Sequence, residues 1–327
     1  MNIKERLKKN KTIRSIGKKV NIRRQHMQDA KDFSRYFTES AVRNGDYRYS
    51  IMLLVHSIEK GMCFPNPRPF GKDKVRDLMQ MLEAVPKQNR KKFEYRLGVA
   101  ALYAWSEFYA SHNWQNESPY SEVTAFLQNK PKETELIAGS KEYVPETVQA
   151  GERQAFEKVI LSRHSVRAFQ NRKLDMADVQ LALRCFVETP TACNRQMCRI
   201  YYVESKRVTD LLNNVLIGVP GFDKKTVQYF VITYDLAAFA YSGERHQGLF
   251  NAGLCAMNFV NGLHANGIGS CCLQWSNKYD QDTAVRKALN LAESERIGIV
   301  IGAGYYLEKN TIPCSARREI KDVFQVI

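Results

Sequence analysis

The chain has 327 residues, of which 44% are hydrophobic and 11% aromatic, so it can bury a large core in one domain or two. Its longest apolar runs fall far short of the roughly 20 residues that cross a bilayer, so we expect no transmembrane helix. The net charge is +15, but over half of this excess lies in residues 1–30, which argues against a nucleic-acid groove and predicts no nucleic-acid partner.

Residues 1–30 form a basic leader that carries ten Lys/Arg and two acidic residues. Within it, Ile13, Ile16, Val20 and Met27 form a weak apolar stripe, which predicts a helix on an anionic membrane surface or against an acidic partner. The alternative is a solvated arm. The leader lacks the apolar core of a secretory signal, and the eight cysteines lack disulfide-like spacing. We therefore expect a cytoplasmic protein, with a peripheral place at the inner membrane face as the alternative.

Residues 31–150 are predicted to be helical. The apolar residues between Ile51 and Ile58 share one face, and Gly61 is expected to end that helix. A second amphipathic helix is predicted from Phe93 to Phe108. From 115 to 145 the sequence becomes polar and contains three prolines, which predicts a boundary or a wrapping connection.

The segment "HSIEKG" in this helical region carries His56, Glu59 and Lys60 within one helical turn. It is interpreted either as a surface triplet or as a group that reaches over a neighbouring site.

Residues 151–327 are predicted to form a domain of alternating helices and short apolar strands. Asp175 and Asp178 open one helix, and a long helix is expected from about Glu244 to Ala265. Runs rich in β-branched and aromatic residues predict strands at 199–203, 228–233, 270–275 and 297–302. The predicted fold class is therefore α+β, with a mixed central sheet flanked by helices and preceded by the helical N-terminal region.

Several common sites are excluded by their motifs. No stretch matches a P-loop, and neither "GIGSCC" nor "GAGYYL" completes a dinucleotide-binding fingerprint. Cys271 and Cys272 are adjacent, which is too close for a usual zinc site, so we expect core thiols and no metal. No Ser or Cys occupies a nucleophile elbow, and no carboxylate pair stands out.

The segment "SRHSVRAF" gathers Arg163, His164, Ser165 and Arg167 at one bend. Arginine offers parallel donors that match a phosphate, and serine adds a short neutral donor, so this basic cluster could hold a phosphomonoester. The alternative is an ordinary solvated turn.

Three later segments, "TPTACNRQ", "GIGSCCLQW" and "PCSARR", follow the basic cluster in a fixed order. With that cluster, they resemble the FMN-dependent nitroreductase family over about residues 155–327. The "HSIEKG" segment is similar to a subgroup that has a helical N-terminal extension and is often linked to surface polysaccharide gene sets.

The resemblance assigns cofactor-binding roles. It implies that the basic cluster and the closing Ser315 and Arg317 contact the phosphate and ribityl chain, and that a turn in "TPTACNRQ" reaches the flavin of the partner subunit. It places the end of the segment "GIGSCCLQW" beside the reactive nitrogen of the ring. Val219 stands where relatives carry an Asn that touches the ring. The implied turn and ring residues are Pro190, Thr191, Asn194, Gln196, Leu273, Gln274 and Trp275.

The activity implied by the resemblance is that of a homodimeric FMN oxidoreductase. NAD(P)H would reduce the flavin, and a small acceptor would then be reduced in a ping-pong order. The flavin carries the chemistry, so no catalytic side chain is expected. Two alternatives are a flavin-dependent redox step on a sugar or lipid-linked intermediate in surface polysaccharide synthesis, and a non-catalytic scaffold at a membrane.

Residues 31–150 have two candidate roles. They could cover the ring face near Trp275 through His56 or Phe64, or they could extend the dimer interface.

Overall fold

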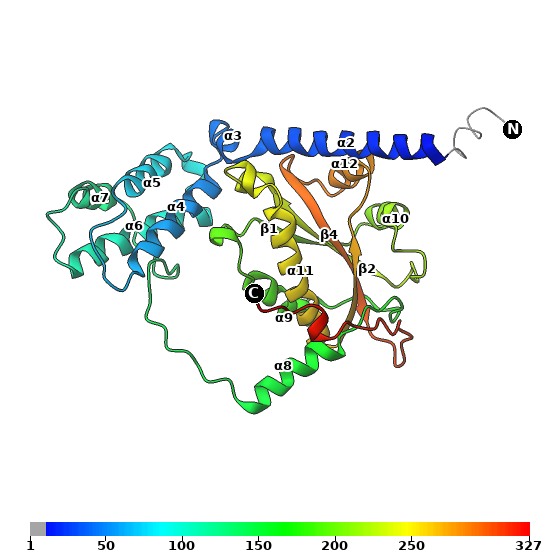
Figure 1. Cartoon of the computed structure of the whole chain (residues 1–327). Coiled ribbons are helices and arrows are strands. Elements are labelled where there is room, and N and C mark those ends of the chain that lie inside the picture. Colours follow the sequence, from blue (N-terminus) through cyan, green and yellow to red (C-terminus); the bar gives the residue numbers. More distant parts are fainter. Residues whose placement is uncertain (1–10) are drawn as a thin grey trace.

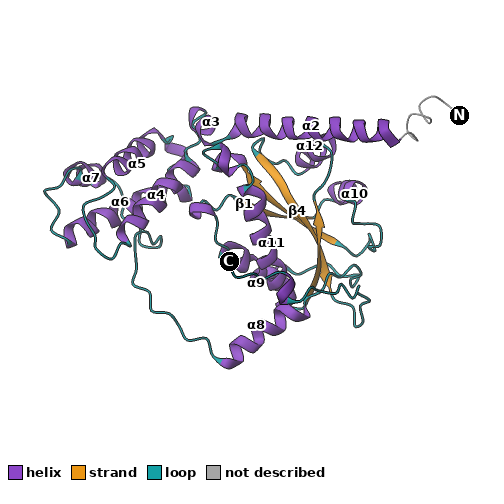
Figure 2. Cartoon of the chain, in the orientation of Figure 1, coloured by secondary structure: helices purple, strands orange, loops and turns teal. Residues whose placement is uncertain are grey.

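The computed structural model describes residues 11–327 and shows two packed regions, which are joined by a long connection (Figure 1). The expected helical N-terminal region and sheet domain are both present, and Figure 2 shows that the strands are confined to the second region. The first ten residues of the basic leader lie outside the described part of the chain. No helix within residues 11–327 is long and apolar enough to cross a membrane.

The N-terminal region packs around the aromatic side chains of Trp105 and Tyr109, which are fully buried. The Tyr109 hydroxyl donates to the Phe70 carbonyl at 2.7 Å, so a loop is held on this core. The helices of this half are α2 (Lys11–Tyr36), α3 (Thr38–Arg43), α4 (Arg48–Met62), α5 (Lys72–Ala84), α6 (Phe93–Ser111) and α7 (Tyr120–Leu127).

Gly61 does not end its helix as predicted, because α4 continues to Met62. The ring of Phe70 packs directly on Gly61, and a Cβ at this position would lie 2.2 Å from Phe70 Cε2. The glycine is therefore required for close packing and not for a helix stop.

The second region contains all four strands of residues 11–327, in the order β1-β2-β4-β3, and every neighbouring pair is antiparallel. One parallel bridge, Ser165 to Ser270, adds a short segment beside β3. The four predicted strands and the α+β class are therefore confirmed. The strands are β1 (Cys198–Val203), β2 (Gln228–Asp235), β3 (Ile268–Gln274) and β4 (Glu295–Tyr305).

Helices cover both faces of this sheet. Helices α9 and α11 pack with Phe230, Ile232 and Ile301 on one face, whereas α10 and α12 contribute to the core on the other face. Asp175 caps α9 by accepting from the Ala177 amide at 2.9 Å, as the sequence predicted. The helices of this half are α8 (Ala150–Ser162), α9 (Met176–Val187), α10 (Lys206–Val215), α11 (Gln247–Ala265) and α12 (Tyr279–Ala288).

The two regions meet where α2, α3 and α4 contact the end of β2. Phe33 stacks on Phe239 with ring centroids 6.3 Å apart, and the Thr38 amide donates to the Phe239 carbonyl at 2.9 Å. Tyr49 and Arg48 of α4 both donate to the buried carboxylate of Asp235, each at 3.2 Å. The N-terminal region is thus fixed to the sheet by apolar contacts and by a buried acid.

Candidate cofactor site

The basic cluster lies where α8 ends and the chain joins the edge of β3. The Val166 amide donates to the Ser270 carbonyl at 3.0 Å, and Ser165 pairs with Ser270 in the parallel bridge. Val166 is buried, which directs its neighbours Ser165 and Arg167 away from the core. Backbone pairing therefore fixes this segment while its polar side chains stay partly accessible.

The arginines of this part of the molecule have no acidic partner. Within residues 11–327, no ion pair joins a carboxylate to Arg163, Arg167 or Arg317, although many other arginines are paired. Arg167 has only a weak contact of 3.5 Å with the Ser165 carbonyl. Unpaired guanidinium groups beside a serine fit an anionic group such as a phosphate.

His264 and Tyr306 lie beside the cluster and were not predicted from the sequence. The His264 ring contacts the Ser162 hydroxyl and the Tyr306 hydroxyl through its two nitrogens, both at 2.8 Å. Burial, and then the positive charges of Arg163 and His164, lower the pKa of His264. No local motif marks these residues, because the chain brings them together across 102 and 42 positions.

The C-terminal segment begins beside the cluster but does not contact it through Ser315 or Arg317. The Asn310 side chain donates to the Ala168 carbonyl at 2.9 Å, which anchors the start of this segment. Five residues span at most about 18 Å, so Ser315 lies at the same end of the sheet. Ser315 and Arg317 are exposed, and no hydrogen bond or ion pair joins them to the cluster in the described residues.

The turn at 190–196 is the second group of predicted residues, and its backbone is unusual. Cys193, Asn194 and Gln196 adopt left-handed φ values of 52°, 50° and 48°, which non-glycine residues rarely do. The Gln196 amide donates to the Thr191 hydroxyl at 2.9 Å. Pro190, Asn194 and Gln196 are exposed, so their surfaces are available to a ligand.

A buried ion pair holds this turn in place. Arg195, 1% exposed, pairs with Glu244 and donates to the Ala238 carbonyl. No local sequence pattern distinguishes Arg195 from its exposed neighbours, so its buried ion pair is not predictable from the motif. Arg195 therefore anchors the turn to the segment that contains Ala238 and Glu244.

The two groups lie at opposite ends of the sheet in one chain. Ser165 pairs with Ser270, which pairs with Ala303 of β4, whereas Cys198 follows the turn and is in register, across Tyr234, with Arg296. Seven residues of strand separate Ala303 from Arg296, or roughly 23 Å. A single chain therefore does not bring the predicted phosphate and turn residues into one compact site.

The predicted ring-lining residues end β3. Leu273 is buried in the core, Gln274 is exposed and donates to the Ser276 hydroxyl at 3.0 Å, and Trp275 is half-buried. The Trp275 indole donates to Asp282 at 2.8 Å, which fixes its orientation. Val219 is fully buried, so it belongs to the core.

The Nitroreductase family model matches residues 160–305, a span that contains the basic cluster, the 190–196 turn and all four strands. This part of the chain is a nitroreductase domain. The match confirms the resemblance that the motifs indicated. The match gives residues 160–305 the class of a nitroreductase-family oxidoreductase.

Solved structures with similarity to the chain cover about half of it. A nitroreductase family protein from Streptococcus pneumoniae is 21% identical, covers 53% of this chain and 100% of its own, and has a TM-score of 0.45. An FMN-dependent nitroreductase from Clostridium difficile is 18% identical, covers 52% of this chain and 98% of its own, and has a TM-score of 0.44. No curated protein matches the chain.

Two expectations about the surroundings of the nitroreductase domain need correction. Cys272 is exposed on β3 while Cys271 is buried, because successive strand residues face opposite sides, so only one of them is a core thiol. Phe64 is 64% exposed, and Trp275 packs in the sheet core beside α12, so one chain does not place Phe64 over Trp275.

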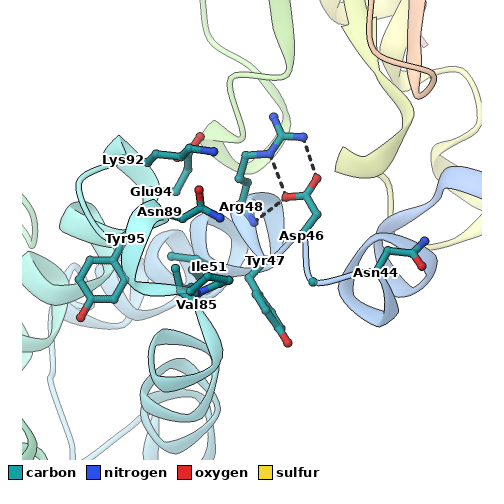
Figure 3. A pocket seen from close by; sticks show the side chains of 12 residues that line it. Asn44, Asp46, Tyr47, Arg48, Ile51, Val85, Asn89, Lys92, Glu94 and Tyr95 are labelled. Carbon is teal, nitrogen blue, oxygen red and sulfur yellow. Dashed lines mark hydrogen bonds and ion pairs between the residues drawn. The ribbon is translucent and has the colours of Figure 1, made fainter.

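A cavity of about 310 Å³ lies outside the nitroreductase domain, in the N-terminal region (Figure 3). Arg48 and Asp46, which line it, form a bidentate pair with distances of 2.8 and 2.7 Å. Burial opposes ionisation of Asp46, but the hydrogen bonds and charge of Arg48 outweigh it and lower the pKa of this carboxyl. The charges of Arg48 and Asp46 are therefore already matched to each other, unlike those of the arginines in the basic cluster.

Proposed function

We propose that residues 151–327 bind FMN and, as a homodimer, use NAD(P)H to reduce a small oxidised acceptor in a ping-pong order. The observation that carries this proposal is the basic cluster, whose arginines have no acidic partner in the described chain and lie at the edge of a nitroreductase domain. We also propose residues 1–30 and 31–150 as separate functional parts of the chain.

The basic cluster would hold the FMN phosphate. Arg163 and Arg167 supply charged donors, Ser165 supplies a neutral one, and His164 adds a further polar group at the same bend. Ser315 and Arg317, on a segment anchored next to Ala168, would close over the phosphate from the other side. The missing acidic partners and the partial exposure of Arg163 and Arg167 fit this role.

Residues at the ends of the strands would surround the ring. Gln274 and Trp275 follow β3, and the indole is already fixed by Asp282. The exposed side chains of Asn194 and Gln196 would come from a second copy, because they lie roughly 23 Å from the basic cluster of their own chain. A two-fold dimer would then form two equivalent sites, each with residues from both copies. Pro190, Thr191 and Leu273 would shape the site around these groups.

The surface of the nitroreductase domain supports a dimer. Phe250, Leu254 and Met257 follow one face of α11 and are 62%, 38% and 42% exposed. At the C-terminus, Val323 and Phe324 are also exposed, at 70% and 65%. Apolar groups repeated along one helix face are typical of a surface that is covered by another chain.

When bound, FMN would itself accept and donate the hydride. The protein residues then have three tasks, which are to bind the phosphate, to donate hydrogen bonds to the polar edge of the ring and to exclude water from one ring face. None of these requires a general acid or base, which agrees with the absence of a carboxylate pair from the motifs. A single open ring face lets NAD(P)H leave before the acceptor enters, which gives the ping-pong order.

The experiment is anaerobic stopped-flow spectroscopy on the purified, flavin-loaded protein. We expect NADH or NADPH to bleach the flavin absorbance within one turnover, and a quinone or nitroaromatic acceptor to restore it after the nicotinamide has been removed. Variant Arg207→Ala, an exposed arginine on α10, serves as a control that should behave as the unmodified protein. A flavin that neither nicotinamide reduces would overturn the proposal.

A further inference from the structure

Helix α2 has two parts that differ in their contacts. Its C-terminal part is docked on the nitroreductase domain through Gln25, which accepts from the Tyr279 amide at 3.2 Å, and Asp32, which pairs with Arg296 at 2.5 Å. Tyr36 donates to Glu293 at 2.8 Å. The orientation of the whole helix is therefore set by the domain beneath it.

The N-terminal part of α2 extends past the domain as a continuous helix (Figure 1). The side chains described between Thr12 and Arg24 are all exposed, and residues 11–28 contain no Asp or Glu. Six Lys/Arg residues fall within residues 11–28. An extended helix of one charge sign is costly to leave without a partner of the opposite sign.

Three exposed apolar residues of α2 lie on the side that faces away from the domain. Ile16, Val20 and Met27 are 57%, 60% and 73% exposed. At about 100° per residue they share one face, whose centre is roughly 150° from the docked residues Gln25 and Asp32. The apolar stripe is therefore unrelated to the packing of α2 on its own chain.

Cations flank this stripe on both sides. Arg23 lies along one edge, and Arg24 and Lys31 lie along the other, with a shallow hollow of about 430 Å³ among them and Val20 and Met27. A second copy of α2 would bring like charges together, which disfavours self-association through this face. Apolar side chains between two rows of cations match an interface where acyl chains lie below anionic headgroups.

We propose that the outward face of α2 binds flat to an anionic membrane surface. Ile16, Val20 and Met27 enter the boundary between headgroups and acyl chains, while the flanking cations contact lipid phosphates. Because Gln25, Asp32 and Tyr36 fix α2 on the nitroreductase domain, the enzyme is held at the surface in one orientation. This inference does not depend on the flavin chemistry proposed above.

The test uses the full chain in flotation assays with two kinds of vesicle, phosphatidylcholine alone and phosphatidylcholine mixed with phosphatidylglycerol. We expect binding only to the mixed vesicles, and a loss of about tenfold or more when the salt concentration is raised. Variant Val20→Asp changes the apolar stripe. Variant Ile22→Asp is the matched control, because Ile22 is 56% exposed on the opposite side of the same helix.

The two variants carry the same charge change and differ only in the face that is altered. Val20→Asp should weaken binding to mixed vesicles about tenfold, and Ile22→Asp should do so by less than about threefold. Equal binding to both vesicle types would overturn the proposal, as would equal losses in the two variants. Binding to polyglutamate without binding to mixed vesicles would also overturn it, in favour of an acidic protein partner. An unchanged midpoint of urea unfolding in both variants shows that the fold is intact.

Discussion

Arginines gather at both ends of the central sheet, but only one end supplies them with acids. At the end that meets α4, Arg199 lies 3.1 Å from Glu295 and 3.6 Å from Asp235, and Arg48 reaches Asp235 at 3.2 Å. At the other end, Arg163 and Arg167 have no acidic partner within the described residues. The same residue type therefore has two uses in one domain.

The difference follows from burial. Asp235 is 0% exposed, and a carboxylate removed from water must be matched by nearby cations and donors. Burial and Glu295 also raise the pKa of the neighbouring Tyr201 to about 12, so that hydroxyl stays protonated and donates to Glu295. This end is closed and structural. The partly exposed arginines of the basic cluster repel one another until an anion joins them, which is the property of a binding site.

The end of the sheet that carries the basic cluster is called the open end, in contrast to the closed end at Asp235. The largest effect is expected from removing cations at this open end. Arg163→Ala combined with Arg317→Ala should weaken FMN binding on the order of a hundredfold or more, because each charge-assisted contact contributes about 1.5 to 3 kcal/mol. The folded state should be retained, since neither side chain takes part in an internal ion pair. Flavin content after desalting measures the loss, and the Arg207→Ala protein provides the comparison.

A double variant that keeps stoichiometric flavin would show that the phosphate binds elsewhere. A variant that loses flavin only because it has unfolded would show no cooperative unfolding transition in urea. Urea titrations therefore accompany the measurement.

At the closed end, Asp235→Ala should act on stability instead of binding. It leaves Arg48, Tyr49 and Arg199 without their shared acceptor, and we expect a loss of about 3 to 5 kcal/mol in the free energy of unfolding. The midpoint of urea unfolding reports the change. The fraction that remains folded should bind FMN with normal affinity.

Asp280→Ala is the matched control, because Asp280 is exposed on α12 and should change stability by less than about 0.5 kcal/mol. If Asp235→Ala were as stable as this control, the buried network would not join the N-terminal region to the sheet.

The smallest effect concerns His264, which reports the charge of the open end. Burial, followed by Arg163 and His164, lowers the pKa of this imidazole from the ordinary value of 6.5. Because the unfolded chain binds the proton more readily, this group contributes stability above about pH 6.5 that is lost as the pH falls. A phosphate bound by Arg163 should raise the pKa of His264 towards its ordinary value.

NMR titration of the histidine signals, with and without inorganic phosphate, measures this change. The signal of His112, the residue that follows α6, is the internal reference. Arg163→Ala should raise the pKa of His264 even without phosphate. A pKa that responds to neither change would place the anion away from Arg163.

The sequence predicted the parts of the fold that depend on local patterns. The apolar runs at 199–203, 228–233, 270–275 and 297–302 all became strands, since β-branched and aromatic residues suit buried extended chain. The prediction that Gly61 ends its helix was wrong, because the ring of Phe70, 9 positions away, determines the role of this glycine. The helix of residues 11–36 was only one of two alternatives, because its stability depends on the docking contacts of Asp32 and Tyr36.

The site was predictable only as separate motifs. The basic cluster and the 190–196 turn could be recognised from their residues, but the separation of roughly 23 Å between them follows from strand register. The contacts of Asp235 with Arg48 and Tyr49 span 187 and 186 positions, and no local signal predicts them. His264 and Tyr306 were not predicted for the same reason, because their contacts also join distant positions of the sequence.

The central claim is that the unpaired arginines bind the phosphate of FMN, and comparing FMN with riboflavin tests it most directly. Riboflavin has the same ring and ribityl chain but no phosphate. Fluorescence titrations of the flavin-free protein should give an affinity for FMN on the order of a hundredfold above that for riboflavin, and Arg163→Ala with Arg317→Ala should abolish most of this difference. Equal affinities for the two flavins, or a preference for FMN that the double variant keeps, would contradict the account.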